Sequence, residues 1–302
     1  MSEERKERGG LAYSPDGHVI GKGRFRIRHS HLRDHIAPLI TDRKLGAAKL
    51  DLVLRGLAFH AEHLGNRKAK AGLVLSRYRY EDLHDLCRPH TYYRGRQEFE
   101  AISLADELAR KSEWVRMQLL VLEDKKLVQR VLDPRGGRPT LYVLSDRGND
   151  QPYDDPGSDP PFITLHGAII ACGAFAEWGT REVVAYLAAL VAERFDPSVN
   201  FAEPGAGNWW RPPSWFADTD KARPNHHIRI PFNKTTLKRG LQALRDDGWI
   251  KAVSMTRNPK TGRRLPRPRN FYTNRFEARA NVSSDLSISI EQFLDSEPEI
   301  NV

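Results

Sequence analysis

A pattern of apolar residues occurs twice in this chain, 122 residues apart, and it constrains the fold more than any other feature. Both copies place apolar residues at offsets 0, +4, +7, +12 and +13, namely Val115, Leu119, Leu122, Leu127 and Val128, and then Leu237, Leu241, Leu244, Trp249 and Ile250. The first three positions of each copy lie on one face of a three-turn helix. The last two positions begin a strand after a turn. The sequence therefore predicts two copies of one helix-and-strand unit.

Residues that flank the repeat support this interpretation. Ser112 and Asn233 stand just before the two predicted helices, where Ser and Asn are favoured as N-caps. Gly248 follows the second helix, where a residue with positive φ is needed. A strand, a turn and a second strand are expected after each helix, over residues 128–144 and 250–276. Each unit is thus predicted to be a helix followed by a hairpin.

This arrangement resembles a known family of DNA-binding domains. Residues 104–109 (LADELA), followed by residues 112–128, look like the helix-turn-helix of bacterial winged-helix regulators, and Ser103 with Asp106 forms a capping box at its start. Residues 235–250 (TTLKRGLQALRDDGWI) resemble the recognition helix and first wing strand of such proteins. Together with the hairpins that follow them, the matching units span residues 103–144 and 233–276, a little under a third of the chain. The resemblance implies an α+β, mainly helical fold with two winged-helix domains in tandem.

The same layout is similar to that of plasmid replication initiators, in which an N-terminal winged helix dimerises and a C-terminal one reads repeated sites. The second unit departs from the winged-helix pattern before Asn233. There, residues 215–221 are expected to supply the preceding helix, and residues 226–232 are expected to form a strand.

Composition shifts along the chain predict the domain boundaries. Residues 145–161 (SDRGNDQPYDDPGSDPP) are rich in Asp, Gly and Pro, which is typical of a linker. The expected order is a basic extension, a first winged helix that mediates association, the linker, a second winged helix that reads DNA, and a disordered acidic tail. These segments span residues 1–45, 46–144, 145–161, 162–276 and 277–302.

Positive charge is concentrated near the second copy of the repeat. The whole chain carries a net charge of +9, whereas residues 221–276 contain 15 Lys and Arg against two Asp, a local charge of +13. Charge of one sign gathered in one segment attracts phosphates. We therefore expect a polyanionic partner for the second unit.

The outward faces of the two repeated helices differ. With Leu237 in the core, four polar residues point outward: Thr235, Lys238, Arg239 and Gln242. Arg–guanine and Gln–adenine are favoured pairings in the major groove. Five basic residues of the following turn, stiffened by Pro266 and Pro268, are predicted to contact the DNA as well: Lys260, Arg263, Arg264, Arg267 and Arg269.

With Val115 in the core, the first helix instead turns a largely apolar set outward: Glu113, Met117, Leu120 and Val121, with Arg116 at the edge. Such a surface suits contact with protein better than with DNA. The first unit is therefore expected to mediate homodimerisation.

Together these features predict a cytoplasmic protein that binds double-stranded DNA sequence-specifically, as a transcriptional regulator or a plasmid-type replication initiator. No catalytic residue, metal site or cofactor is predicted. Neither GxxxxGK(S/T) nor GxGxxG, the glycine motifs of nucleotide-binding proteins, occurs, so nucleotide-driven work by this chain is not expected. Two cysteines indicate a reducing compartment, and neither a secretory signal nor a membrane-spanning segment is expected.

Two other interpretations remain open. His29 and His31 with Tyr92 or Tyr93 faintly resemble the paired histidines and nucleophilic tyrosines of rolling-circle nucleases, which use a metal ion. A covalent adduct with single-stranded DNA would reveal that activity. The second interpretation is a winged-helix adaptor that binds only proteins. Replacing Arg239 and Gln242 would leave the function of such an adaptor intact. His84, Cys87 and His90 lack a fourth ligand at familiar zinc spacing.

Overall fold

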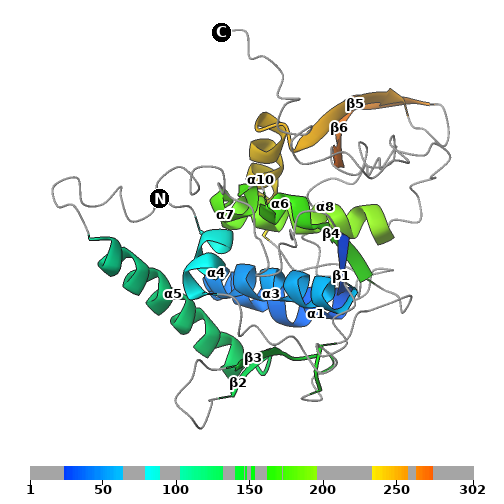
Figure 1. Ribbon diagram of the computed structural model, residues 1–302. Coiled ribbons are helices and arrows are strands. Elements are labelled where there is room, and N and C mark those ends of the chain that lie inside the picture. Colours follow the sequence, from blue (N-terminus) through cyan, green and yellow to red (C-terminus); the bar gives the residue numbers. More distant parts are fainter. Residues whose placement is uncertain are drawn as a thin grey trace. The chain divides into compact units, whose positions relative to one another are not determined.

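The computed structural model describes ten segments of the chain and divides it into two compact units, Met1–Glu177 and Trp178–Val302. The described segments are residues 24–63, 79–88, 103–131, 140–145, 147, 151–153, 162–171, 173–195, 233–257 and 263–274. They are mainly helical and form small antiparallel two-stranded sheets (Figure 1). The predicted α+β, mainly helical class is confirmed.

The described elements of the first unit are β1 (Arg24–Arg28), α1 (His29–His31), a π-helical turn (Leu32–Ile36), α2 (Ala37–Thr41), α3 (Leu45–His63), α4 (Tyr80–Cys87), α5 (Leu104–Asp124), β2 (Val128–Val131), β3 (Thr140–Val143), β4 (Phe162–His166), α6 (Gly167–Ala171) and α7 (Ala174–Glu177). Those of the second unit are α8 (Thr180–Phe195), α10 (Lys234–Asp246), β5 (Ile250–Arg257) and β6 (Arg264–Asn274).

Helix α3 is the centre of the first unit. Every residue from 47 to 58 is buried, so the helix is covered on all sides. It packs against α4, α5 and β1. The sequence predicts an amphipathic helix over residues 47–64, because Leu50, Val53, Leu54 and Leu57 recur at helical spacing. A helix that is buried all round belongs to a core rather than to a surface, so α3 is more deeply enclosed than this pattern predicts.

The boundary between the units differs from the predicted one. Strand β1 pairs antiparallel with β4, and Phe25 and Ile27 are buried opposite Leu165 and Ile163. Residues 24–45 are thus part of the first core and no basic extension, and residues 162–177 belong to the first unit. The strand itself is expected from the sequence, where residues 24–30 (RFRIRHS) form a basic, strand-like stretch, but its place in the first core is not. A pairing between strands this far apart leaves no local signal.

The segment predicted as the linker does not separate the units. Ser145 donates its N–H to the Gln151 carbonyl at 2.7 Å, and Tyr153 donates its N–H to the Val143 carbonyl at 2.9 Å. The described part of residues 145–161 therefore continues the β2–β3 hairpin within the first unit. The predicted acidic tail at 277–302 and the elements expected at 215–221 and 226–232 lie outside the described residues.

Helix α5 is a single helix where the sequence analysis expected two. Ser103 caps it by accepting the Asp106 N–H at 3.1 Å, as predicted. Ser112, the expected cap of a second helix, lies in mid-helix and donates its hydroxyl to the Glu81 carboxylate. The predicted helix-turn-helix over residues 104–124 is therefore wrong. The preference of Ser for a cap is local, and neither Gly nor Pro interrupts this segment.

The repeat itself is confirmed. The three helical positions are fully buried in both copies, and an antiparallel hairpin follows each helix. Both helices also end in the same two backbone hydrogen bonds, from Lys126 to Glu123 and Leu127 to Leu122 in α5, and from Gly248 to Arg245 and Trp249 to Leu244 in α10. Lys126 and Gly248 have positive φ, 54° and 75°. This is the Schellman termination.

Candidate nucleic-acid interface

Helix α10 is fixed at its start and along one face. The Asn233 side-chain oxygen accepts the N–H groups of Thr235 and Thr236 at 2.8 and 3.3 Å, which confirms the predicted N-cap. Leu237, Leu241 and Leu244 are fully buried. Helix α10 packs across α8 within the second unit (Figure 1).

A glycine allows this close crossing. A Cβ atom added at Gly240 would lie 1.9 Å from the carbonyl oxygen of Arg181 and 2.8 Å from the Cβ of Ala185. The backbones of the two helices therefore approach each other at Gly240 more closely than any residue with a side chain would allow. This contact sets the direction in which the opposite face of α10 points.

The opposite face is polar and exposed. Thr235, Lys238, Arg239 and Gln242 are all exposed, as the helical rotation predicts. The structure therefore brings these four predicted residues onto one accessible helix surface. A helix fits into the major groove of B-DNA, and these side chains match phosphates and base edges chemically.

A hydrogen-bonded cluster that the sequence analysis missed lies at the end of this face. Gln242 donates its Nε2 to both carboxylate oxygens of Asp246, at 2.9 and 2.8 Å. Arg245 donates Nε and Nη2 to Asp246 Oδ1 at 3.1 and 2.8 Å. The sequence does contain a signal for this cluster: Gln242 and Asp246 are four residues apart, and residues at this spacing are neighbours on a helix surface.

The β5–β6 hairpin, predicted as a wing, is longer than expected. The expected turn reached residue 269, but β6 already begins at Arg264. The pairing passes from Met255 opposite Arg269 to Arg257 opposite Arg264, so residues 265–268 lie opposite Thr256 alone. Two of these four are prolines, which have no N–H to donate to a ladder, and such a break in register is where they are tolerated.

The predicted wing contacts fall in three groups. Arg263 and Arg264 are exposed at the start of β6. Arg267 and Arg269 are residues of β6. Lys260 lies outside the described residues.

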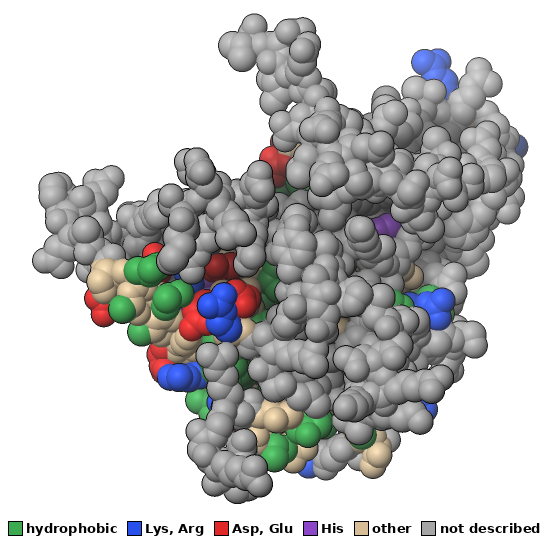
Figure 2. Space-filling view, in the orientation of Figure 1, with side chains coloured by type: hydrophobic (Ala, Val, Ile, Leu, Met, Phe, Trp, Pro, Cys, Tyr) green, Lys and Arg blue, Asp and Glu red, His purple; other side chains and the backbone are tan. Residues whose placement is uncertain are grey.

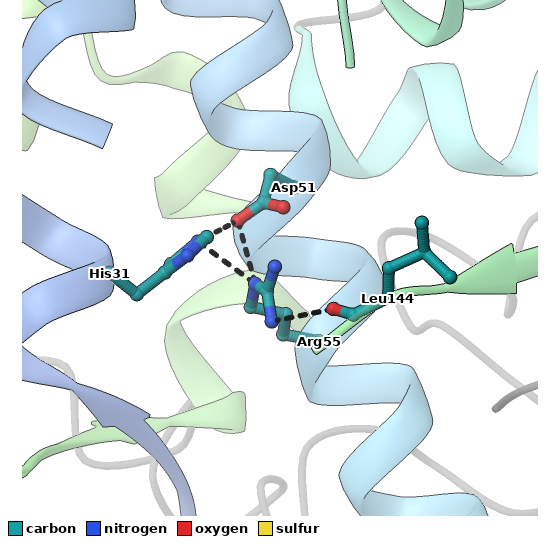
Figure 3. A network of polar contacts seen from close by, with 4 residues as sticks. All are labelled: His31, Asp51, Arg55 and Leu144. Carbon is teal, nitrogen blue, oxygen red and sulfur yellow. Dashed lines mark hydrogen bonds and ion pairs between the residues drawn. The ribbon is translucent and has the colours of Figure 1, made fainter. Parts of the chain in front are cut away.

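The first unit holds a buried polar network that joins three elements (Figure 3). His31 Nε2 lies 2.6 Å from Asp51 Oδ2, and Arg55 Nε lies 3.0 Å from the same oxygen. Arg55 Nη1 also donates to the Leu144 carbonyl at 3.3 Å. Burial alone would raise the pKa of Asp51, but the charges of Arg55 and His31 hold it well below its usual value. The network therefore ties α1, α3 and the end of β3 together through an ionised carboxylate.

This network also bears on the nuclease interpretation. His29 and His31 lie on a helix rather than a strand and are 2 % and 0 % exposed, and the His31 ring is held by Asp51. Tyr92 and Tyr93 lie outside the described residues. Within the described segments no three His, Cys, Asp or Glu side chains are grouped so that they could hold a metal ion. The described geometry does not favour an accessible metal site at the two histidines.

The His84/Cys87 pair lies on α4, where both side chains are buried. Burial raises the pKa of the Cys87 thiol to about 12, so the thiol is protonated at neutral pH and is a poor metal ligand. His90 lies outside the described residues.

The exposed side of α5 is partly apolar. Met117 is 51 % exposed and Leu120 50 %, with Glu113 and Arg116 exposed beside them and Val121 half-buried. Figure 2 shows hydrophobic side chains among acidic and basic ones over this helix. The predicted outward face of the first repeated helix is thus exposed.

Comparison with known proteins gave no match to a family model, a curated protein or a solved structure. Among the helices of the described segments, none has the length and apolar character that crossing a membrane requires.

Proposed function

We propose that the second unit binds double-stranded DNA as a winged helix, with α10 in the major groove and the β5–β6 hairpin against the backbone. The observation that supports this most is the sidedness of α10: Leu237, Leu241 and Leu244 are fully buried, and Lys238 and Arg239 are exposed on the opposite side.

Electrostatics point in the same direction. The segment that contains α10 and the hairpin carries a charge of +13, more than the whole chain. Arg263 and Arg264 are exposed at the start of β6, where a wing would meet the phosphates. Phosphate contacts supply most of the affinity for DNA of any sequence, and base contacts supply the specificity.

In the proposed protein the first unit associates and the second reads DNA. The first helix of the repeat presents Met117 and Leu120 where α10 presents Arg239 and Gln242, so α5 does not present a comparable reading surface. Binding alone is sufficient for a transcriptional regulator or a plasmid-type replication initiator, and the proposed role is one of these two.

The test is a titration of the full chain against labelled duplex DNA at 50 mM salt. Arg239→Ala is expected to cost about 1–3 kcal/mol if it contacts a base, whereas Lys238→Ala weakens all sequences alike. Arg116→Ala is the matched control, because Arg116 occupies in α5 the repeat position of Lys238 and is exposed. With about six phosphate contacts, affinity falls roughly a thousandfold between 50 and 200 mM salt.

No duplex binding at 50 mM salt, or equal losses for Arg116→Ala and Arg239→Ala, would refute the proposal. Full function after replacement of Arg239 and Gln242 would indicate a protein adaptor. Selection of bound fragments from native DNA then separates the two roles, because an initiator is expected to select repeated sites.

We further propose that two copies associate through α5. Five exposed residues spaced by three and four form a stripe along this helix: Arg110, Glu113, Met117, Leu120 and Asp124. Arg110 and Asp124 stand seven residues on either side of Met117. When two such helices pack antiparallel about Met117, Arg110 of each copy faces Asp124 of the other. A twofold interface must be self-complementary in this way.

Charge reversal tests this pairing. Arg110→Asp or Asp124→Arg alone is expected to weaken the dimer in sedimentation experiments, and the double reversal to restore it. Lys44→Asp, at an exposed residue outside α5, is the control. A monomeric wild type, or a double variant weaker than either single one, would contradict the arrangement.

A further inference from the structure

We infer that Asp246 is a positioning residue for sequence reading: it holds the amide of Gln242 in the orientation that recognises adenine. This inference rests on the proposed function of α10. It assigns a specific role to an acidic residue on a surface whose other exposed groups are suited to DNA.

The geometry of the pair is well defined. Gln242 and Asp246 are one helical turn apart, both exposed, and joined by contacts of 2.9 and 2.8 Å from Gln242 Nε2 to the two carboxylate oxygens. An exposed glutamine without such a contact samples many rotamers and loses that freedom when it binds. The contact to Asp246 reduces this loss in advance.

The carboxylate also decides which way the amide faces. A carboxylate only accepts hydrogen bonds, so the NH₂ group of Gln242 must face Asp246, and the reversed amide would place two oxygens against each other. One amide hydrogen serves Asp246. The other hydrogen and the carbonyl oxygen remain as a donor and an acceptor side by side.

This donor–acceptor pair matches one base. In the major groove adenine presents the N7 acceptor beside the N6 donor, whereas guanine presents two acceptors, N7 and O6. With its amide fixed, Gln242 can pair with both adenine groups, and its carbonyl oxygen would oppose O6 of guanine. The arrangement therefore favours adenine over guanine at the base pair that Gln242 meets.

Arg245 makes the acidic group tolerable at this surface. Its Nε and Nη2 donate to Asp246 Oδ1, which fixes the carboxylate and offsets its charge. An acid facing DNA otherwise weakens binding by repelling phosphates. The neighbouring Asp247 is exposed as well, and none of the hydrogen bonds found for Gln242 involves it. Asp247 is therefore a matched control for the effect of charge alone.

The experiment uses the full chain, a selected duplex site and the same site with the contacted A·T pair replaced by G·C. The contacted base pair is found with Gln242→Ala: it is the position at which this variant loses the preference for A·T over G·C. Asp246→Ala is expected to reduce the ratio of the two affinities by about tenfold, toward that of Gln242→Ala. Its affinity for random duplex DNA should rise, because a negative charge is removed. Asp247→Ala should also raise the affinity for random DNA and should leave the ratio unchanged.

An unchanged ratio in Asp246→Ala, or an equal fall in Asp247→Ala, would overturn the inference while leaving DNA binding by α10 in place. Asp246→Glu, which retains a carboxylate, should recover part of the ratio. A wild-type chain that binds no duplex DNA would overturn the proposed function and this inference together.

Discussion

Replacing Gly240 with alanine tests the packing on which the orientation of α10 depends. The added Cβ would lie 1.9 Å from the Arg181 carbonyl oxygen, 2.6 Å from its carbon and 2.8 Å from Ala185 Cβ. Contacts shorter than 3.0 Å essentially never occur for a Cβ atom, so α10 and α8 must separate by about 1 Å. The obstacle is backbone, and a rotamer change cannot remove it.

Two opposing effects decide whether Gly240→Ala raises or lowers the free energy of unfolding. Alanine is a better helix former than glycine by about 0.5–1 kcal/mol. Overpacking typically costs about 1–3 kcal/mol, and a rigid backbone obstacle places this site at the upper end. Separation of the helices also loosens the packing of Leu237, Leu241 and Leu244. We expect Gly240→Ala to lower the free energy of unfolding by about 2 kcal/mol.

Urea unfolding of the full chain measures this loss, and hydrogen exchange of residues 234–246 locates it in the second unit. Ala243→Gly on the same helix isolates the propensity effect, at about 1 kcal/mol. Adding Ala185→Gly to Gly240→Ala should restore little of the lost stability, because the carbonyl of Arg181 remains in place. A Gly240→Ala variant as stable as the wild type would refute the close crossing.

Two further predictions concern the first unit. Lys126→Gly should stabilise the chain by about 1 kcal/mol in urea unfolding, because Lys126 has a φ of 54°, which costs a residue with a side chain about 1–2 kcal/mol. Asp51→Asn should destabilise it by about 3–5 kcal/mol at pH 7, since it leaves Arg55 buried without its carboxylate. Because the folded-state pKa of Asp51 is lowered, the advantage of the wild type is fully present above the ordinary Asp value of about 3.9 and should shrink as pH falls below it. A constant difference in unfolding midpoint from pH 7 to pH 3 would contradict this.

Local patterns in the sequence predicted the parts of the fold that depend on neighbouring residues. The offsets of the repeat, the Asn233 cap and the positive φ of Gly248 all follow from spacing of a few residues, and the structure has each of them. The exposed face of α10 follows from the same helical periodicity. These features could be predicted because their causes lie within one element and its caps.

Features that depend on distant partners could not be predicted in this way. The strand-like pattern of residues 24–30 is visible in the sequence, but the burial of Phe25 and Ile27 requires β4, more than 130 residues later. Ser112 has the local signature of a cap, yet Glu81 from α4 accepts its hydroxyl, and the helix continues. The spacing of Gln242, Arg245 and Asp246 is visible in the sequence, where Asp246 trails at the far end of the outward face, but the hydrogen bonds among the three side chains were not predicted.

The two copies of the repeat share one packing pattern, and this pattern does not determine the function of either helix. The buried positions of α5 and α10 carry nearly the same apolar residues and end in the same backbone hydrogen bonds. Their exposed side chains do not pack in the core and are free of this constraint. Met117 in α5 corresponds to Arg239 in α10, and Leu120 corresponds to Gln242. The proposed association and the proposed DNA reading thus differ only in residues that the core does not contact. The variants that test the two proposals are accordingly placed on the faces where the copies differ.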